Sequence, residues 1–260
     1  MNAEVPSIRE RLARGELLLG VFLQLGSAVA AEIAARSGPD WALIDLEHGS
    51  GTEADLIPQL QGLGIVGTPA MVRVESLSRL RIGRALDLGA RGIMVPQVDD
   101  VEAAREFIRF LRYPPQGLRG VGLSARGAGY GAASHTDVGR IGESLTGIVQ
   151  IETNKGLSNA SQIASVEGVD VLFVGPSDLS HAVGVPGNFE STLYVNALRS
   201  IADAAQSHGK ALGVHIPGSS EFERYYSLGF RFISVGTDAS AVAAGIRDAL
   251  HQARHAHPDR

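Results

Sequence analysis

The stretch WALIDLEHGS, residues 41–50, begins as a continuous apolar strand and ends in an aspartate, a glutamate and a histidine. A strand that is apolar at consecutive positions is typical of a parallel sheet whose two faces are both covered. Seven similar runs occur along the chain, and helix-like segments separate them. The eight strands are therefore predicted at residues 17–25, 41–46, 69–74, 92–96, 147–151, 169–174, 210–216 and 231–235.

Eight strand–helix units in 260 residues favour a closed (β/α)8 TIM barrel, an α/β fold that reaches this size as a single domain. A short internal sequence similarity supports this fold. The segments LGARGIMV at 88–95 and LGFRFISV at 228–235 share a glycine, an arginine and a following strand, and they belong to units half a barrel apart. The alternative is a doubly wound sheet, which needs a glycine-rich fingerprint after an early strand. The nearest match, LQLGSAVAAE at 23–32, lacks the G-x-G-x-x-G spacing.

The barrel is expected to occupy residues 1–253, with a short N-terminal helix before the first strand and a flexible C-terminal tail at 254–260. Residues 113–135, YPPQGLRGVGLSARGAGYGAASH, are dense in glycine and fit neither a helix nor a strand. They are predicted to form a long mobile loop after the fourth strand. Long loops of this kind are often active-site lids.

Composition limits the classes of function. The chain has 44% hydrophobic residues and a net charge of −5, which argues against a surface for nucleic acid or an anionic membrane. The absence of cysteine excludes disulfides, thiolate catalysis and Cys-ligated zinc. The N-terminal segment lacks the pattern of a signal peptide, and the apolar run after it is too short to span a bilayer. A soluble cytoplasmic protein is expected.

Polar side chains gather where the predicted strands end. In a (β/α)8 barrel the active site lies at these carboxyl ends, so residues found there are candidates for catalysis or binding. The opposite ends of the strands carry far fewer such groups. The polar residues at the carboxyl ends are Asp45, Glu47, His48, Arg73, Gln150, Glu152, Asp178 and His215.

Two of these acids, Glu152 and Asp178, follow neighbouring strands, so their carboxylates could share one divalent cation. Two carboxylates completed by water and substrate oxygens suit a hard octahedral ion such as Mg2+ or Mn2+. Each acid could instead cap a helix or pair with an arginine. The chain has only two lysines, Lys155 and Lys210, and neither projects from the carboxyl end of a strand, which argues against Schiff-base chemistry.

Other residues at these ends indicate substrate binding and proton transfer. Ser177 and Asp178 begin a helix, where free N–H groups could hold a substrate carboxylate or could simply be capped. His48 is a candidate general base, or else a structural histidine. Arg73 has apolar neighbours, so its charge requires a carboxylate of the protein or an anionic substrate.

Asp87 falls in the last turn of a predicted helix, where the helix macrodipole disfavours an anion. It could pair with Arg84 or Arg91, which are its nearest cations along the chain. It could also orient a catalytic group. Both interpretations stay open at the level of sequence.

Several motifs together resemble the HpcH/HpaI aldolases over about residues 17–250. They include DWALIDLEHG, MVRV, ALDLGARGIMVPQVDDVEAAREFIRFLRYPPQGLRGVG, IVQIET, VDVLFVGPSDLS and LGFRFISVGTD. Members of that family are metal-dependent, pyruvate-specific class II aldolases that act on 4-hydroxy-2-oxo acids. The resemblance implies the same fold and the same class of reaction, in aromatic or sugar-acid catabolism.

The resemblance also implies a role for each matching residue. The metal ligands for Mg2+, Mn2+ or Co2+ would be Glu152 and Asp178, and Gln150 would line the same pocket. Arg73 would contact the keto oxygen that becomes an enolate. The remaining roles are that His48 acts as base through a bound water, Asp87 orients it, and the amides of Ser177 and Asp178 hold the pyruvate carboxylate.

A retro-aldol reaction follows from this resemblance. The 4-hydroxyl proton is removed, the C3–C4 bond breaks, and pyruvate and an aldehyde are released. The partners would be a small 2-oxo acid and an aldehyde, without nucleic acid or membrane. Family members are typically hexamers built as trimers of dimers, so a homo-oligomer is expected.

The chain departs from the family pattern in GSGTEADL after His48 and in LSARGAGYG within residues 113–135. Both segments are expected to face the aldehyde, so pyruvate specificity is predicted and the aldehyde is not. Arg119 and Arg126 could meet an acidic aldehyde or could be solvated loop charges, and the second interpretation is preferred. The alternatives for the whole protein are an oxaloacetate decarboxylase, an acyl-CoA lyase, or a non-catalytic barrel that binds a 2-oxo acid.

Overall fold

All eight predicted strands are present in the computed structural model, which describes residues 6–256. They pair in parallel in chain order, and β1 also pairs with β8, so the sheet closes into a barrel. The predicted (β/α)8 fold is confirmed, and the doubly wound alternative, which has an open sheet, is excluded. The strands are β1 (Leu18–Leu23), β2 (Trp41–Asp45), β3 (Ala70–Arg73), β4 (Gly92–Val95), β5 (Thr146–Ile151), β6 (Val171–Val174), β7 (Ala211–Ile216) and β8 (Phe230–Thr237).

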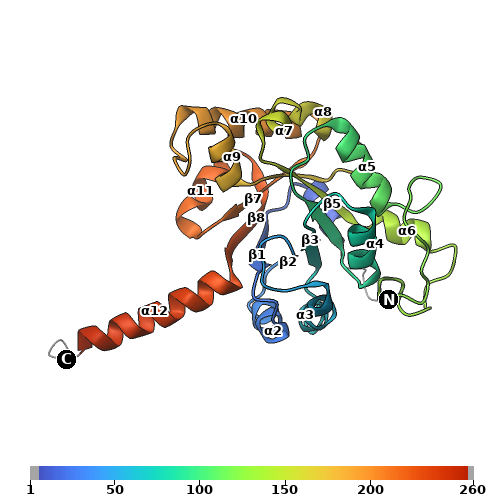
Figure 1. The fold of residues 1–260 in the computed structure, drawn as a ribbon, viewed down its shortest axis with the longest axis horizontal. Coiled ribbons are helices and arrows are strands. Elements are labelled where there is room, and N and C mark those ends of the chain that lie inside the picture. The colour runs from blue at the N-terminus through green and yellow to red at the C-terminus, as the bar shows by residue number, and fades with distance from the viewer. Residues whose placement is uncertain (1–5, 257–260) are drawn as a thin grey trace.

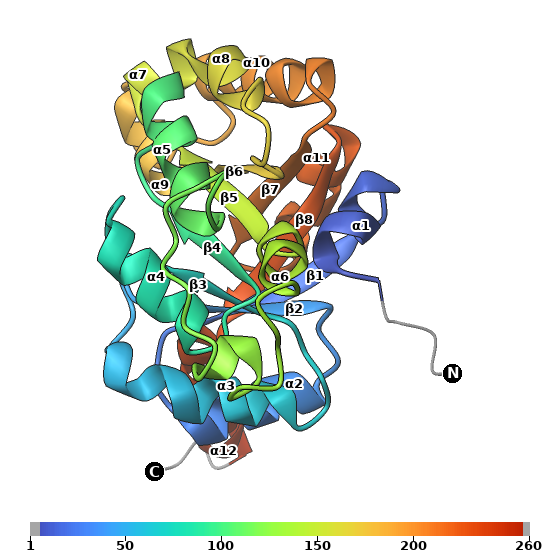
Figure 2. The ribbon, with the colours of Figure 1, turned by 90° about the vertical axis from the view of Figure 1, so that its right-hand side faces the viewer.

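Helices surround the barrel, as Figure 1 and Figure 2 show from two directions. The predicted N-terminal helix is α1 (Ile8–Ala13), and it begins with reciprocal hydrogen bonds between Ser7 and Glu10. The following helices are α2 (Ala28–Arg36), α3 (Leu56–Gly64), α4 (Arg79–Asp87), α5 (Val101–Leu111), α6 (Val138–Glu143), α7 (Asn154–Ser158), α8 (Ala160–Ala164), α9 (Pro176–Ala182), α10 (Thr192–Ser207), α11 (Phe222–Ser227) and α12 (Asp238–Ala256).

The inside of the barrel is filled by large side chains from alternating positions of the strands. Trp41 stacks on Phe232 with ring centroids 3.8 Å apart. Gly20 on the neighbouring strand makes room for this pair, because a Cβ atom there would clash with the Trp41 ring. Ile8 and Leu12 of α1 belong to the same buried cluster. The interior is therefore a packed core, which leaves the strand ends for function.

A second apolar layer lies between the outer faces of the strands and the surrounding helices. Outward-facing residues such as Ile44 and Val72 form one buried cluster with helix residues such as Leu60 and Ile82. Strands buried on both faces explain why the sequence shows continuous apolar runs instead of alternation.

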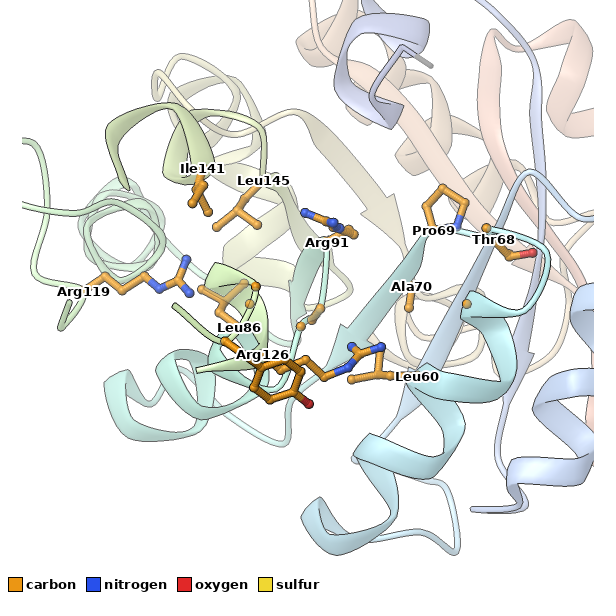
Figure 3. A pocket seen from close by; sticks show the side chains of 17 residues that line it. Leu60, Thr68, Pro69, Ala70, Leu86, Arg91, Arg119, Arg126, Ile141 and Leu145 are labelled. Atoms are coloured by element: carbon orange, nitrogen blue, oxygen red, sulfur yellow. The ribbon is translucent and has the colours of Figure 1, made fainter. Parts of the chain in front are cut away.

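The glycine-rich loop 113–135 lies at the N-terminal end of the barrel, because it follows α5 and precedes β5. It forms one wall of a cavity of about 380 Å³ that is also lined by the starts of β3 and β4 (Figure 3). The prediction that this loop is a lid is therefore wrong for the active site of its own chain. The interpretation of Arg119 as a solvated charge is also wrong, since only 4% of its surface is exposed.

The last helix, α12, projects away from the barrel (Figure 1), and residues 240–256 are exposed along their whole length. Residues 254–256 of the predicted flexible tail continue this helix, and residues 257–260 lie outside the described residues. Within residues 6–256, no helix has the length and apolar character that a membrane span requires.

Candidate active site

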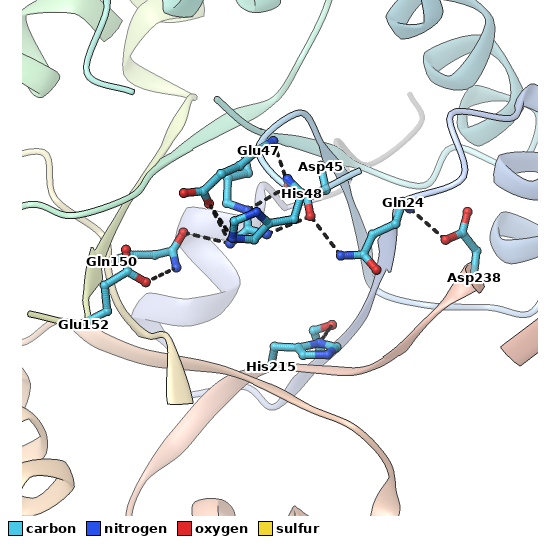
Figure 4. A network of polar contacts seen from close by, with 10 residues as sticks. Gln24, Asp45, Glu47, His48, Gln150, Glu152, His215 and Asp238 are labelled. Carbon is cyan, nitrogen blue, oxygen red and sulfur yellow. Dashed lines mark hydrogen bonds and ion pairs between the residues drawn. The ribbon is translucent and has the colours of Figure 1, made fainter. Parts of the chain in front are cut away.

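Alternation along the strands places the predicted polar residues inside the mouth of the barrel. Trp41 and Leu43 of β2 belong to the interior cluster, so Asp45, two residues further, points the same way at the end of the strand. Arg73 follows Met71 on β3 by the same rule. Inward-facing apolar stripes thus end in polar groups, and these groups meet at one end of the barrel (Figure 4).

Asp45 is the centre of this network and is almost fully buried. Arg73 donates from Nε to Asp45 Oδ1 at 2.9 Å and from Nη2 to Oδ2 at 2.7 Å, which makes a two-point ion pair. Gln24 Nε2 donates to Oδ2 at 3.0 Å, and the backbone N–H groups of Glu47 and His48 donate to Oδ1. Burial opposes ionisation of Asp45, but the bonds and charge of Arg73 outweigh it and hold the pKa of Asp45 below its usual value.

The Arg73 guanidinium is held on its other edge as well. Its Nη1 lies 2.9 Å from Glu47 Oε2 and donates to Gln150 Oε1 at 3.4 Å. The Phe22 ring lies against it, with the guanidinium carbon 5.4 Å from the ring centroid. Burial lowers the pKa of Arg73, yet the bonds to Asp45 more than offset this and raise the pKa above its usual value. Arg73 is therefore a fixed, permanent cation.

Glu152 extends the network from Arg73 toward β6. Gln150 Nε2 donates to Glu152 Oε2 at 2.8 Å, and Gln97 N donates to Glu152 Oε1 at 2.9 Å. Burial raises the pKa of Glu152 to about 7, and the negative charges of Asp178 and Glu47 add to the rise. A nearby divalent cation would offset this penalty, because its charge stabilises the ionised carboxylate.

The donor set fits a hard divalent cation. Asp178 lies in the first turn of α9, is exposed, and forms no hydrogen bond or ion pair with another described side chain. Gly175 leaves space beside Glu152, since a Cβ atom there would clash with Glu152 Oε2. Among residues 6–256, no three His, Asp or Glu side chains are grouped closely enough to bind an ion. Two carboxylates would therefore need water and substrate oxygens to complete the coordination of such an ion.

Two histidines lie at the mouth in different environments. His48 has 63% of its side chain exposed, and its Nε2 is 4.0 Å from Glu47 Oε2, so it can exchange protons with a bound substrate. His215 packs on Phe22 with ring centroids 5.0 Å apart. Burial, reinforced by the charge of Arg73, lowers the pKa of His215 to about 4, so its ring is neutral at physiological pH.

Asp87 does not reach the mouth in this chain. It ends α4 at the opposite end of the barrel, where its Oδ1 lies 3.2 Å from Arg119 Nη2. The predicted pairing with Arg84 or Arg91 is wrong, since Arg119 is the partner and Arg84 pairs with a glutamate before α3. Within one chain Asp87 cannot orient His48, and that role stays a prediction for an assembly of chains.

Neither lysine joins the network around Arg73. Lys155 Nζ pairs with Asp100 Oδ2 at 2.7 Å, and Lys210 Nζ donates to Val166 O at 3.2 Å. The geometry therefore agrees with the argument against a Schiff-base mechanism.

Three residues that shape the site were missed by the sequence reasoning. Gln24 follows Phe22 by two positions on the inward stripe of β1, so alternation alone would have found it. Gly175 stands before a proline at a helix start, which is a visible signal. Gln97 holds Glu152 through its backbone N–H with φ of 52°, and no sequence signal predicts that conformation.

These features define a class of protein. A (β/α)8 barrel whose mouth holds a fixed arginine, a pair of carboxylates suited to a divalent cation and an accessible histidine is an enzyme built to stabilise negative charge on a small carbonyl acid.

Comparison with known proteins identifies the family. The family model for HpcH/HpaI aldolase/citrate lyase matches residues 18–244, and the chain belongs to this family. It is 40% identical over 240 residues to the hydroxypyruvate/pyruvate aldolase of Delftia acidovorans, across 92% of this chain and 89% of that protein. It is 36% identical over 254 residues to the 2-keto-3-deoxy-L-rhamnonate aldolase of Escherichia coli, across 97% of this chain and 93% of that protein.

A solved structure agrees with the same assignment. The HpcH/HpaI aldolase/citrate lyase family protein from Burkholderia cenocepacia J2315 superposes with a TM-score of 0.90 at 33% sequence identity. The match covers 95% of this chain and 98% of that one, so the likeness extends over the whole barrel.

Proposed function

We propose that this protein is a class II aldolase that reversibly cleaves a 4-hydroxy-2-oxo acid into pyruvate and an aldehyde with the help of a divalent cation. It is a carbon–carbon lyase, because its family and its aldolase relatives match along almost the whole chain. The observation that carries the finer proposal is the continuous network from Asp45 through Arg73 and Gln150 to Glu152.

Glu152 and Asp178 would hold the cation, which we expect to be Mg2+, Mn2+ or Co2+. When bound, the cation polarises the carbonyl group of the 2-oxo acid as a Lewis acid. Gln150 and the backbone N–H of Gln97 hold one oxygen each of the Glu152 carboxylate, so its orientation is set before any ligand arrives.

Arg73 stabilises the negative charge that develops on the keto oxygen. Asp45 holds the guanidinium in two places, so little reorganisation is needed when that charge appears. Gln150 lines the same pocket and is buried beside Arg73. The N–H groups of Ser177 and Asp178 at the start of α9 bind the substrate carboxylate, since a first helical turn leaves its donors free.

His48 removes the proton of the 4-hydroxyl group, either directly or through a water molecule. The C3–C4 bond then breaks, the aldehyde leaves, and the electron pair passes into the enolate of pyruvate, whose oxygen faces Arg73. A proton delivered to C3 completes pyruvate. The exposed position of His48 at the mouth suits a group that must meet the aldehyde half of the substrate.

We also infer a homo-oligomer, specifically a hexamer of three dimers. The support from this chain is α12, whose Val242, Ile246 and Leu250 are each more than half exposed and share one helix face. An exposed apolar stripe of this kind is usually covered by a neighbouring chain in an assembly. A cytoplasmic location also remains a proposal, and a chain without cysteine suits a reducing compartment.

The first experiment needs no knowledge of the aldehyde. The protein is incubated with pyruvate in D2O, and loss of the methyl proton signal is followed by NMR with Mg2+ or Mn2+ and then with EDTA. Exchange that requires the metal and stops with EDTA is the expected result, because it reports enolate formation. A folded protein that shows no exchange with any divalent metal would refute the aldolase mechanism.

A histidine variant separates catalysis from binding. His48→Ala should lose cleavage of a 4-hydroxy-2-oxo acid by about 100-fold or more, while pyruvate binding measured by calorimetry is retained. His208→Ala is the matched control, since His208 lies at the end of α10, is exposed, and shares a hydrogen bond with Ser161 far from the mouth network. Equal activity in both variants would remove His48 from the mechanism.

A further inference from the structure

The cavity at the N-terminal end of the barrel is chemically unlike the rest of the protein. It has a volume of about 380 Å³ and shares no lining residue with the mouth network. Three arginines line it, namely Arg91, Arg119 and Arg126, and no aspartate or glutamate does. A concentration of positive charge in a chain of net charge −5 is a specific local feature, and it lies outside the mouth network of its own chain.

Arg119 is the most deeply buried of the three arginines. Only 4% of its surface is exposed, yet its Nε and Nη1 atoms are buried without a hydrogen-bond partner. Its Nη2 meets Asp87 at 3.2 Å, and the Tyr113 ring covers its face at 4.5 Å from the guanidinium carbon to the ring centroid. Because other protein atoms cover Nε and Nη1, Arg119 contributes its positive charge to the cavity, and the hydrogen bonds to a ligand come from Arg91 and Arg126.

Arg126 is held beside the same cavity. Its Nη1 donates to Leu88 O at 3.1 Å, just past the end of α4. Gly89 makes this approach possible, because a Cβ atom there would clash with the Arg126 guanidinium. The side chain is therefore fixed at one edge, and its remaining N–H groups are available to a second partner.

Arg91 completes the cluster from the residue before β4. It is exposed, and its guanidinium forms no ion pair with any side chain in residues 6–256. Figure 3 shows Arg91 in the middle of the cavity, with Arg119 reaching in from the loop and Arg126 lying below. The three cations come from two segments far apart in sequence, so only the folded chain assembles them.

We propose that this cavity is a second anion-binding site, for a small molecule that carries carboxylate or phosphate groups. Guanidinium groups match both anions through paired N–H donors, so the shared chemistry is a compact oxyanion with at least two acceptor oxygens. The cavity is large enough for a small metabolite, and Leu60, Leu86 and Leu145 provide an apolar wall beside the charged one. Within one chain the site lies at the opposite end of the barrel from the mouth.

Calorimetry on the metal-free full-length protein tests this site, with inorganic phosphate and malonate as the two probes. We expect one ion of either probe to bind per chain, and comparison of the two affinities identifies whether phosphate or carboxylate is preferred. The double variant Arg91→Gln/Arg126→Gln should weaken binding by about tenfold or more, because each lost guanidinium removes a charge-assisted hydrogen bond. Arg91→Gln alone is the milder variant if the double variant does not fold.

The matched control is Arg79→Gln/Arg105→Gln, which removes the same net charge from exposed positions of α4 and α5. It should bind both probes as tightly as the original protein. Equal binding by the control and the cavity variants would place the anion elsewhere, at the mouth for example, and would overturn the proposal. So would the absence of any binding at millimolar probe, or a change of oligomeric state in the cavity variants without a change in anion affinity.

Discussion

At the scale of single residues, Asp45 is the side chain around which the hydrogen bonds at the mouth are arranged. It accepts hydrogen bonds from Arg73, from Gln24 and from two backbone N–H groups of its own turn. One buried carboxylate therefore sets both the position of the arginine and the shape of the segment that carries His48. Asp45 is therefore a positioning residue: it acts by holding Arg73 and the turn before His48 in place, without touching the substrate itself.

Asp45→Asn should reduce kcat/KM by about 100-fold or more, because an amide cannot accept both guanidinium bonds and leaves the Arg73 charge uncompensated. Steady-state kinetics with a 4-hydroxy-2-oxo acid measure the loss. Asp40→Asn is the control, because Asp40 also pairs with an arginine, Arg11, but at the opposite end of the barrel. Similar kcat/KM for the two variants would contradict the role given to Asp45.

The raised pKa of Glu152 predicts that the stability of the folded protein depends on pH. Burial raises the pKa of Glu152 to about 7, above the value of 4.5 for an ordinary glutamate, so the folded metal-free protein binds this proton more tightly than the unfolded chain does. The stabilisation is present below pH 4.5 and is lost as the pH rises through 7. The contribution is on the order of 3 kcal/mol.

Urea unfolding in EDTA between pH 5 and pH 8 measures this effect. The free energy of unfolding should fall with pH more steeply in the original protein than in Glu152→Gln, which has no proton to release at this position. Added Mn2+ should restore stability at the alkaline end, since a cation stabilises the ionised carboxylate. Parallel pH profiles for the two proteins in EDTA would show that Glu152 titrates normally.

At the scale of elements, the turn between β6 and α9 prepares the cation ligands. Gly175 leaves the space that the Glu152 carboxylate occupies, and the next residues begin the helix that carries Asp178. A side chain at position 175 must therefore displace Glu152 or move the start of α9. Either movement separates the two carboxylates.

Gly175→Ala should weaken Mn2+ binding by about tenfold or more, as changes next to metal ligands commonly do. Calorimetric titration with Mn2+ measures the change. Gly83→Ala is the control, because Gly83 lies within α4 with nothing near its missing Cβ atom, and this variant should bind Mn2+ normally. Undiminished binding by Gly175→Ala would mean that Glu152 is not a ligand.

The strands and the loop 113–135 differ in how well the sequence predicts their position. The eight strands were predictable because each is a run of apolar residues buried on both faces, bounded by polar turns. The loop 113–135 was misplaced although its signal was present: it follows a helix, and helices in this fold run from the carboxyl ends of the strands back to the amino ends. Its glycine content indicated a loop but did not indicate which end of the barrel it covers.

At the scale of the whole molecule, α12 is exposed from residue 240 to residue 256. Val242, Ile246 and Leu250 are exposed by 51%, 58% and 51%, and their spacing puts them on one face of the helix. Val29 and Ile33 of α2 are exposed as well, by 68% and 63%. Apolar surface of this kind favours association of chains.

Val242→Asp/Ile246→Asp should shift the protein to smaller species in sedimentation velocity, because burying two carboxylates in an apolar contact is unfavourable. The control is Ala241→Asp/Gln252→Asp, which adds the same charge on the other side of α12 and should leave the assembly intact. An unchanged sedimentation coefficient in the first variant would exclude this face of α12 from the interface.

The sequence by itself determined the barrel and the identity of the mouth residues Asp45, Arg73, Gln150 and Glu152. It could do so because strand periodicity is local: alternate residues face the same side, and the carboxyl ends of parallel strands share one rim. The tertiary structure alone decided that Asp87 pairs with Arg119 and that Gln97 holds Glu152.

The cavity lined by Arg91, Arg119 and Arg126 was also decided by the tertiary structure alone. It depends on side chains brought together by the packing of a long loop under the barrel, and no spacing along the chain records such contacts. Pairings between distant segments are set by how the whole chain closes, whereas the direction of a side chain on a strand is set by its immediate neighbours. That physical difference separates what could be predicted for this protein from what had to be observed.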